Sequence, residues 1–424
     1  MKNFVGNFSI IAKIFFLLSK IAENVANNGL IKSFSKYKNY RKPTSNLIKL
    51  NKLEFYKFLK RDNLILIIDH NNSGGAIKYR KNFIKLNSNR NIILLVYNMI
   101  RMKYEVHCFS ANSSELSYFS DFDLKTMKTR QFYGKVSEIL YNSLVFYYNP
   151  LEILELINFV YSKNLAKITV AVHDYFSICP SYNLINKNKK YCNLPDIKVC
   201  KSCLNSHNNS FVKYFTDREP ENWRKKWELL LNNASEILCF SNSSVSLLIK
   251  AYPSINVNNI IIKKHSLESL ETPIMSKEKI HIGILGNINF IKGGEIVRDL
   301  SKYLKMSGKD ISISIIGNIE EKYKDDFMKE YGFYEVRDLP SILEKLSVNL
   351  IFMPSICPET FSYVTHEVIQ MKIPLVCFNL GAQAEATISY NKGKVIPLNL
   401  PTEEIYRKIE KHFYDVRTQE KNVV

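Results

Sequence analysis

The sequence predicts an α/β protein made of two doubly wound domains, each with a parallel sheet covered by helices. Three observations support this fold class. Short apolar runs that are typical of buried strands alternate with helical stretches between residues 61 and 400. A polar stretch at 266–279, which contains Pro273, separates two such series and is typical of a linker. The length of 424 residues also exceeds the roughly 250–300 residues at which single hydrophobic cores stop growing.

The first series, residues 61–268, is predicted to form the N-terminal domain. It opens with "LILIIDHNNSGGAIKYRKNFIKL", which is an apolar strand ending at Asp69, a glycine-containing loop and a helix. Further strands are expected in "NIILLVYN", "YEVHCFS", "KITVAVHD", "ASEILCF" and "NNIIIKKHSL", and "SLVFYYN" precedes the helix "LEILELINFVYSKN". Strands and helices repeated at this spacing indicate a parallel sheet with helices on both faces.

The second series, residues 269–400, is predicted to form the C-terminal domain. Its strands are expected in "IHIGILGN", "ISISIIGN", "NLIFMPS" and "IPLVCFN". A last helix, at about Thr402 to Tyr414, has no obvious place in its own domain. We therefore expect residues 401–424 to cross back to the N-terminal domain.

Residues 1–60 form a basic segment that precedes both domains. They carry 12 Lys and Arg residues against 2 acidic residues, and so hold more than half of the net charge of +19. Within them, "FSIIAKIFFLLSKIAENVANN" has polar side chains near one helical face. Lys13 and Lys20 disfavour a transmembrane helix, and the lack of a small-residue cleavage site disfavours a signal peptide. Two interpretations stay open: a helix lying on an anionic membrane surface, and a helix packed on the protein itself.

Two glutamates stand out in the second series, within residues 354–385. The order strand, loop, helix, strand, loop in this stretch is that of a βαβ unit, whose ligands bind at the carboxyl ends of the strands. Glu359 is expected in the loop at a strand end, and Glu367 about two helical turns further on, on the same side. Carboxylates suit ligand hydroxyls, while backbone N–H groups at a helix N-terminus suit phosphates.

The spacing of these glutamates, within "PETFSY…E", resembles the Glu-x7-Glu hallmark of the retaining glycosyltransferases of family 4. "NFIKGG", "ASEILCFSNSSVSLLIKAYPSINVNNIIIKKHSL" and "HDYFSICPSYNLINKNKKYCNLPDIKVCKSCL" also resemble segments of that family, the last those of a bacterial surface-polysaccharide subset. The likeness covers about residues 64–400. It implies the GT-B fold, in which two Rossmann-like domains face each other across a cleft.

The resemblance implies roles for several residues of the second domain. Glu359 would contact hydroxyls of the donor sugar, and backbone amides near Thr360 and Phe361 would face the donor. Glu367 would bind the ribose of the nucleotide. Lys292 would bind the donor diphosphate, where a positive charge suits the negative charge that grows on the leaving group.

The chain departs from the family at one position and matches it at others in the first domain. Where the family usually has an arginine before that lysine, this chain has Asn287. Lys263, Lys264 and Arg80 are the candidates to replace the missing charge. His265 would either touch the donor or cap a strand end.

Gly74 and Gly75 match the glycine-containing first loop of the family, where the backbone can approach the donor phosphates. Such a pair of glycines also marks ordinary turns. His173, followed by Asp174 and Tyr175, matches a histidine that reaches the sugar in relatives. The resemblance thus makes His173 and Glu359 the catalytic candidates.

The eight cysteines fall into two groups. Four lie in or beside apolar strands and are expected to be small buried residues: Cys108, Cys239, Cys357 and Cys377. The other four crowd into the loop 179–207 with the spacing C-x12-C-x7-C-x2-C: Cys179, Cys192, Cys200 and Cys203. The second group suits a structural zinc site, and the alternatives are free thiols and disulfides. Disulfides are disfavoured without a secretion signal.

The resemblance therefore implies a retaining glycosyltransferase that moves a sugar from a nucleotide sugar to a lipid-linked bacterial surface glycan, such as lipopolysaccharide. No acidic pair suited to a catalytic metal follows a strand near the proposed diphosphate site, so no cofactor is expected for catalysis. The protein is expected in the cytoplasm, peripherally on the inner face of the membrane. The alternatives are a non-catalytic scaffold that binds nucleotide sugars, which Asn287 keeps open, and a nucleic-acid-binding protein, which the confinement of the charge to residues 1–60 disfavours.

Overall fold

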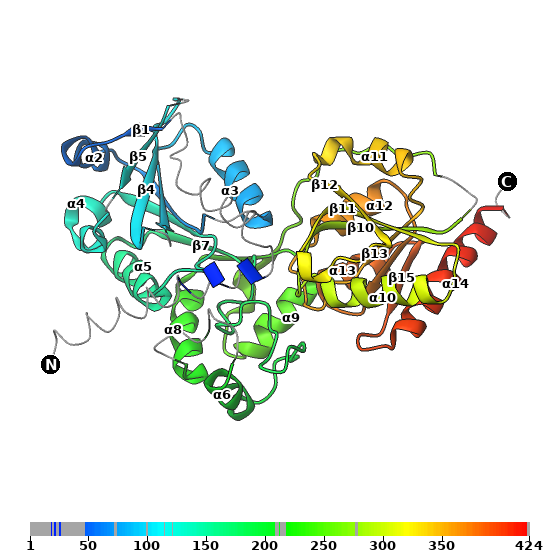
Figure 1. Cartoon of the computed structure of the whole chain (residues 1–424). Helices are drawn as coiled ribbons and strands as arrows, with labels where there is room; N and C mark the ends of the chain where they lie inside the picture. Colours follow the sequence, from blue (N-terminus) through cyan, green and yellow to red (C-terminus); the bar gives the residue numbers. More distant parts are fainter. Residues whose placement is uncertain are drawn as a thin grey trace. The chain divides into compact units, whose positions relative to one another are not determined.

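The computed structural model describes residues 18, 21–22, 25–26, 47–71, 74–98, 101–113, 115–120, 122–207, 212, 218–275 and 279–421. The chain divides into two compact units, which are described separately (Figure 1). Unit 1 comprises Met1–Phe240 and Ser244–Lys263, and unit 2 comprises Ser241–Ser243 and Lys264–Val424. The predicted basic amphipathic helix lies, apart from a few positions, outside the described residues. Among the helices that are described, none combines the length and the apolar character that a membrane span requires.

Unit 1 contains a nine-stranded sheet in the order β1-β5-β4-β3-β2-β6-β7-β8-β9. Its strands are β1 (Ile48–Lys49), β2 (Leu64–Ile68), β3 (Ile92–Asn98), β4 (Lys103–Phe109), β5 (Leu116–Ser120), β6 (Val136–Tyr141), β7 (Lys167–Ala171), β8 (Glu236–Cys239) and β9 (Ile260–Ile262). The expected parallel arrangement holds for every pair except those that involve β4, which runs antiparallel to β3 and β5. The four-residue connection from β3 to β4 is too short for a crossover and permits only a hairpin.

Three strands of unit 1, β1, β5 and β6, lie where the sequence analysis placed none, and β6 is the one beside the switch point. Residues 143–149, "SLVFYYN", form a loop, and the strand next to β2 is β6, which immediately precedes them. The run "VSEILY" was missed because polar residues interrupt its first half, while Ile139, Leu140 and Tyr141 are buried at its end.

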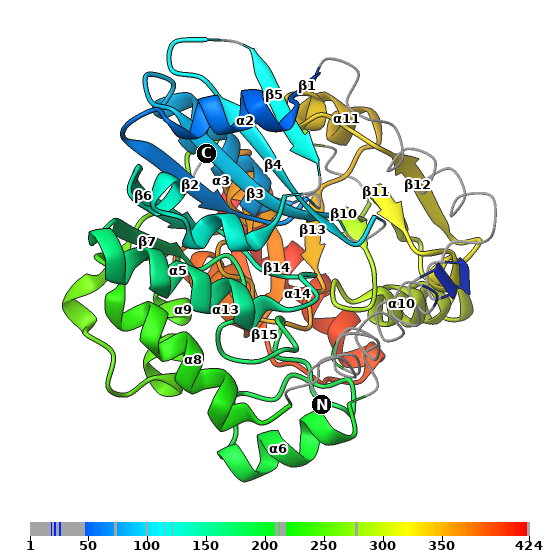
Figure 2. The same ribbon diagram turned by 90° about the vertical axis from the view of Figure 1, so that its left-hand side faces the viewer.

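The helices of unit 1 cover the sheet. They are α2 (Lys52–Leu59), α3 (Gly75–Leu86), α4 (Arg130–Tyr133), α5 (Pro150–Asn164), α6 (Ile197–Asn205), α8 (Pro220–Asn233) and α9 (Asn242–Ala251), with 3-10 turns η1 (Leu124–Lys128) and η2 (Val257–Asn259). Helices α5 and α8 lie side by side (Figure 2). Trp223 and Trp227, one helical turn apart on α8, are fully buried and pack edge-on against Phe176. Each such side chain contributes about 2–3 kcal/mol by burial.

Unit 2 contains a six-stranded sheet in the order β12-β11-β10-β13-β14-β15, and all of its strand pairs are parallel. Its strands are β10 (His281–Ile288), β11 (Ser312–Ile319), β12 (Met328–Gly332), β13 (Leu350–Met353), β14 (Leu375–Phe378) and β15 (Gly393–Ile396). Its helices are α10 (Gly294–Met306), α11 (Leu339–Lys345), α12 (Tyr363–Gln370), α13 (Gly381–Ile388) and α14 (Thr402–Lys421), with 3-10 turns η3 (Glu321–Tyr323) and η4 (Val336–Asp338). This is the predicted second doubly wound domain.

The C-terminal helix α14 packs within unit 2, next to α10 (Figure 1). Ile405, Ile409 and Phe413, spaced one turn apart, are buried in the core of that unit. The expectation that residues 401–424 cross back to the N-terminal domain is therefore wrong for this helix. The apolar stripe of α14 is buried by packing against α10 and the sheet beside it.

Each sheet has one point at which the strand order reverses. In unit 1 the chain moves outward from β2 to β3 on one side and continues with β6 on the other. In unit 2 the same reversal separates β10 from β13. Ligands of doubly wound sheets bind outside the carboxyl ends of the strands at such switch points. The two switch points are therefore where functional side chains are to be sought.

Candidate functional site

The switch point of unit 2 brings together two residues that are far apart in the sequence. Lys292 lies in the loop after β10, and Glu359 lies in the loop after β13. Because β10 and β13 are parallel neighbours, both loops leave the same edge of the sheet. The Lys292 Nζ atom lies 2.6 Å from Glu359 Oε1. The structure thus pairs two of the residues that the sequence analysis proposed separately.

A glycine makes this approach of the two loops feasible. Gly293 has a φ of 78°, in the left-handed region that favours glycine. A Cβ atom there would lie 2.1 Å from the carbonyl oxygen of Pro354, the first residue after β13. Any other residue would push the loops apart, so the glycine after Lys292 is required for its contact with Glu359.

The backbone around Glu359 is held from the other side by α13. The N–H of Glu359 donates to Oε1 of Gln383 (3.0 Å), and the N–H of Ala382 donates to the carbonyl oxygen of Glu359 (2.9 Å). Gly381, with a φ of 63°, has no room for a Cβ, which would lie 2.6 Å from the Glu359 nitrogen. The side chain of Glu359 also accepts a hydrogen bond from Ser355 Oγ (2.7 Å). Glu359 is therefore fixed before any ligand arrives.

Both members of the ion pair stay charged near neutral pH. Burial would raise the pKa of Glu359, but the positive charge of Lys292 and hydrogen bonds from Lys292 and Ser355 outweigh it and lower that pKa. Burial would likewise lower the pKa of Lys292, but the Glu359 carboxylate raises it. The Lys292 side chain is 38% exposed, whereas that of Glu359 is 14% exposed. The lysine is thus the more accessible partner for an incoming anion.

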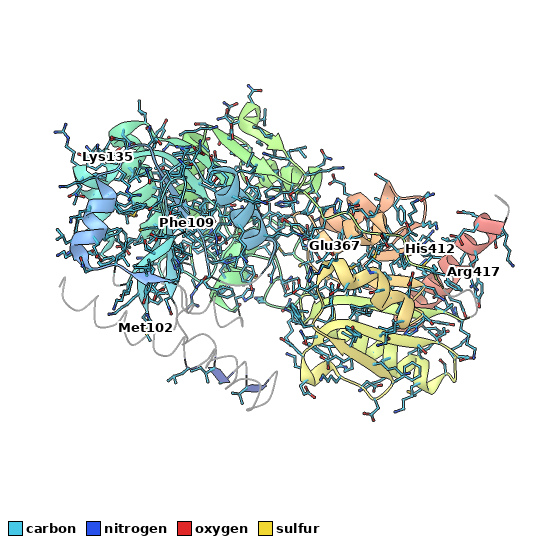
Figure 3. All side chains as sticks on the ribbon, turned by 90° about the horizontal axis from the view of Figure 1, so that it is seen from above. Met102, Phe109, Lys135, Glu367, His412 and Arg417 are labelled. Carbon is cyan, nitrogen blue, oxygen red and sulfur yellow. The ribbon has the colours of Figure 1, made fainter. Side chains whose placement is uncertain are left out.

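Glu367 projects from α12, the helix that follows the Glu359 loop (Figure 3). It is buried, with 4% of its surface exposed. Burial, and after it the charge of Glu367, raise the pKa of Tyr334. Thr360 and Phe361 lie in the loop between Glu359 and α12, as the sequence analysis expected.

Phe361 belongs to an aromatic cluster at the start of α12. Its ring stacks on that of His366, with 4.2 Å between centroids, and the ring of His265 meets it edge-on at 4.6 Å. His265 also stacks on Tyr363 at 5.0 Å. The Phe361 side chain is therefore part of the packing at the start of α12. Sequence reasoning missed His366, whose helical position beside Glu367 was the available signal.

Asn287 takes part in a neutral contact at the ends of two strands. Its Oδ1 accepts a hydrogen bond from Asn318 Nδ2 (3.0 Å), and the two residues are paired in the register of β10 and β11. Of the three candidates to replace the missing arginine, Arg80 already forms an ion pair with another residue. Its Nη1 lies 2.7 Å from the buried carboxylate of Asp69 in unit 1.

The switch point of unit 1 carries a second polar cluster, which we call the His173 cluster: Asp69, Arg80, Asn142 and His173. Asp69 directly follows β2, Asn142 directly follows β6, and His173 follows β7 by two residues. Nε2 of His173 lies 2.9 Å from Oδ1 of Asn142. Burial raises the pKa of Asp69, against the opposing charges of His70 and Arg80. Sequence reasoning missed Asn142 because the strand before it was not recognised.

Neighbouring side chains hold the ring of His173. Phe240 stacks on it with 4.7 Å between centroids and 17° between planes, and Tyr79 lies at 5.0 Å. Next to His173, Asp174 accepts hydrogen bonds from Ser143 Oγ (2.7 Å) and from a backbone N–H, and burial raises its pKa.

The glycine pair of the first loop lies at the start of α3. Gly75 is the first residue of that helix, and Gly74 precedes it with a φ of 132°. A Cβ atom on Gly74 would meet nothing within 4 Å. Its backbone conformation, rather than lack of space, is therefore what favours glycine there.

The four cysteines that were expected to be buried are buried: Cys108, Cys239, Cys357 and Cys377. The other four are partly buried free thiols of the loop 179–207. Cys203 Sγ accepts the N–H of Lys187 (3.3 Å), and Cys200 Sγ accepts Nη2 of Arg224 (3.6 Å). In the part of the chain that the structure describes, no three His, Cys, Asp or Glu side chains are placed to hold a metal ion. The zinc site stays a prediction.

Comparison with known proteins gives a match at the level of structure. No protein-family model and no curated protein matches the sequence. Among solved structures, Anabaena Alr3699/HepE in complex with UDP-glucose is similar to this chain, with a TM-score of 0.54, 14% identity, and coverage of 84% of this chain and 90% of that one. Sucrose-phosphate synthase from Thermosynechococcus elongatus has a TM-score of 0.53, 11% identity, and coverage of 83% and 90%.

A third solved structure, a glycosyltransferase from Rickettsia africae, has a TM-score of 0.50 at 14% identity and covers 84% of this chain and 89% of that one. At 11–14% identity these likenesses establish the fold alone. Each unit of this chain has the doubly wound α/β architecture that the sequence analysis predicted, and these solved structures match the chain over more than four fifths of its length.

Proposed function

We propose that the protein is a glycosyltransferase that takes a sugar from a nucleotide-sugar donor, and that the donor binds at the switch point of unit 2. One observation carries the proposal: Lys292 and Glu359, 67 residues apart, meet at 2.6 Å at the carboxyl ends of β10 and β13. A structural ion pair can lie anywhere on a protein, but a preformed and partly exposed one at a switch point is suited to a ligand with both phosphates and hydroxyls.

The expected roles divide by charge. Lys292 binds the diphosphate and offsets the negative charge that develops as the glycosidic bond breaks. Glu359 accepts hydrogen bonds from sugar hydroxyls, Glu367 from the ribose, and the backbone N–H groups of Thr360 and Phe361 face the donor. UDP-glucose is the first donor to test, because it is bound in the similar Anabaena structure.

We further propose that transfer retains the anomeric configuration, and that it places this chain with the family 4 enzymes that the motifs resemble. The departing phosphate oxygen would take the proton of the acceptor hydroxyl on the same face of the sugar. NMR of an early product distinguishes the two stereochemical outcomes: retention is expected, and an inverted anomer would exclude this mechanism.

The acceptor is proposed to be a lipid-linked bacterial surface glycan at the inner face of the cytoplasmic membrane. The support is the net charge of +10 in residues 1–60, which suits an anionic lipid surface. Full-length protein should sediment with vesicles that contain anionic lipid, and a variant without residues 1–45 should stay in the supernatant. Equal sedimentation of both proteins would contradict the membrane role of this segment.

The donor site is tested by thermal stabilisation of the full chain with UDP-, GDP-, ADP- and dTDP-sugars, without added metal. A ligand that binds only the folded state must raise the melting temperature, by RT ln(1 + [L]/Kd) in free energy. Stabilisation by one nucleotide class, lost in Glu367→Ala and kept in Glu420→Gln, is the expected result. No stabilisation by any donor would contradict the proposal. Donor binding without turnover would instead favour the scaffold function that Asn287 keeps open.

Structural zinc in the loop 179–207 is proposed independently of catalysis. Cys200 and Cys203 lie in one turn-spaced C-x2-C pair and accept N–H donors, and cysteine sulfurs with this spacing are common ligands of structural zinc. Protein purified without chelators should contain one zinc ion per chain, which Cys200→Ser should lose and Cys108→Ala should retain. Metal-free protein with four thiols that react with a thiol reagent would exclude the site.

A further inference from the structure

The amide of Asn142 lies between the two charged and titratable parts of the His173 cluster. Asn142 is fully buried at the end of β6. Its Nδ2 donates to the carbonyl oxygen of Ala76 (3.0 Å), and its side chain also hydrogen-bonds the Asp69 carboxyl group. Its Oδ1 lies 2.9 Å from Nε2 of His173. One side chain thus joins the buried Asp69–Arg80 pair to the histidine.

These contacts determine which way the amide points. The carbonyl oxygen of Ala76 can only accept, so the NH₂ group of Asn142 must face it. The amide oxygen therefore faces His173, and it too can only accept. Nε2 of His173 must then carry a hydrogen. In the neutral ring, the lone pair is consequently on Nδ1.

The surroundings hold this arrangement in place. Asp69 accepts hydrogen bonds from Arg80 Nη1 (2.7 Å) and from the N–H of His70 (2.7 Å). The ring of His173 cannot flip freely, because Phe240 stacks on it. A residue that fixes both the orientation and the tautomer of a functional histidine does so through another group and need not touch the ligand.

We propose that Asn142 is a positioning residue that keeps His173 in the Nε2–H tautomer, so that Nδ1 acts as a hydrogen-bond acceptor for a sugar hydroxyl. This inference rests on the proposed glycosyltransferase function. Any group that meets Nδ1 of the neutral ring must donate a hydrogen bond. A phosphate oxygen cannot do so, whereas a carbohydrate hydroxyl can. Nδ1 of His173 is therefore suited to a hydroxyl group and not to a phosphate oxygen.

The tautomer can be measured without any ligand, by long-range ¹H–¹⁵N correlation spectra of the full chain labelled with ¹⁵N-histidine. At about pH 8 an imidazole with its ordinary pKa of about 6.5 is neutral. The chain supplies its own references. Nε2 of His207 and of His412 faces a backbone carbonyl oxygen, so these rings must be Nε2–H, whereas Nδ1 of His366 faces the carbonyl oxygen of Ser362. Loss of one signal set in His173→Gln assigns the residue.

The expected spectrum shows His173 with the pattern of His412. The pattern of His366, or an average of the two tautomers, would overturn the proposal. This result does not depend on turnover. A correct tautomer in a protein that binds no nucleotide sugar would contradict the proposed function while leaving the orientation of Asn142 established.

The functional consequence is tested with Asn142→Leu, which removes the acceptor that faces Nε2 at a similar side-chain volume. The neutral ring is then no longer held as Nε2–H, so the His173 signals should shift towards an average of the two tautomers and kcat/KM should fall by about tenfold. Asn149→Leu, at the exposed N-cap of α5, is the matched control and should leave both the spectrum and kcat/KM unchanged. An unchanged His173 tautomer in folded Asn142→Leu would overturn the positioning role. If that variant does not fold, the wild-type spectrum still decides the tautomer.

Discussion

Each of the two switch points has an ion pair between a residue near a strand end and a residue of a neighbouring loop or helix. The two pairs differ in how exposed their side chains are. In unit 1, Asp69 and Arg80 pair at 2.7 Å, with side-chain exposures of 0% and 9%. In unit 2, Glu359 and Lys292 pair at 2.6 Å, with exposures of 14% and 38%. The distances are nearly equal, and the accessibility of the cation differs about fourfold.

This difference in accessibility separates structure from function. A buried pair that loses one partner leaves an unpaired charge in a medium of low dielectric, which costs several kcal/mol. A partly exposed pair is screened by water and contributes little to stability. Its cation can exchange one anion for another at small cost. We therefore expect the pair of unit 1 to matter mainly for stability and the pair of unit 2 mainly for ligand binding.

The largest effect is expected from breaking the pair of unit 1. Asp69→Asn leaves the Arg80 guanidinium buried without its counter-charge and should lower the free energy of unfolding by about 3 kcal/mol. Denaturant unfolding measures this value. Glu138→Gln, which removes the partly exposed partner of Arg90 in the same unit, should cost less than about 1 kcal/mol. Equal costs for the two variants would remove the contrast between the switch points.

The second effect is on catalysis. Glu359→Gln leaves the shape of the side chain unchanged, removes the charge that orients Lys292, and should lower kcat by about 100-fold with little change in melting temperature. Nucleotide release from the donor identified in the thermal panel measures the rate. Glu420→Gln, which removes the partner of Lys392, is the control and should retain full activity. Loss of fold rather than of rate in Glu359→Gln would mean that this pair, too, is structural.

The smallest expected effect is on the stability of the protein at acidic pH. The pKa of Glu359 is lower in the folded state than its ordinary value of 4.5. Because the unfolded chain takes up the proton first, the stability that Glu359 contributes is present above pH 4.5 and is lost as the pH falls through the lowered value. Wild type should therefore exceed Glu359→Gln by about 1 kcal/mol near neutrality, and the difference should vanish in acid. A difference that is constant across this range would contradict the assigned ionisation.

Four of the six strands of unit 2, namely β10, β11, β13 and β14, could be predicted from the sequence because they lie in mainly apolar runs, and the proposed motifs lie after two of them. The loops of Lys292 and Glu359 follow two such strands, so their meeting could be anticipated from the parallel topology. The contact itself depends on Gly293 lying against Pro354, which is a matter of tertiary packing. The role of α14 could not be read from its sequence, since an apolar stripe indicates burial without naming the partner.

Unit 1 was harder to predict for a physical reason. The strand β6 mixes polar and apolar residues, so its period was hidden and Asn142 at its end went unnoticed. The antiparallel β4 was expected as a strand, but its direction is set by the short connection from β3 and not by its composition. Residues that act by holding another residue in place, such as Asn142 and Gln383, carry no motif and become visible only when their hydrogen bonds are known.

The central claim, that the pair in unit 2 is a donor site, is tested most directly by the affinity of the identified nucleotide sugar for Lys292→Met, measured by titration calorimetry. Lys392→Met is the matched control, since Lys392 also pairs with a glutamate at 2.6 Å in the same unit. The account predicts that Lys292→Met weakens binding by about tenfold or more, equivalent to roughly 1.4 kcal/mol, while Lys392→Met binds as wild type does. Equal dissociation constants for all three proteins would contradict it.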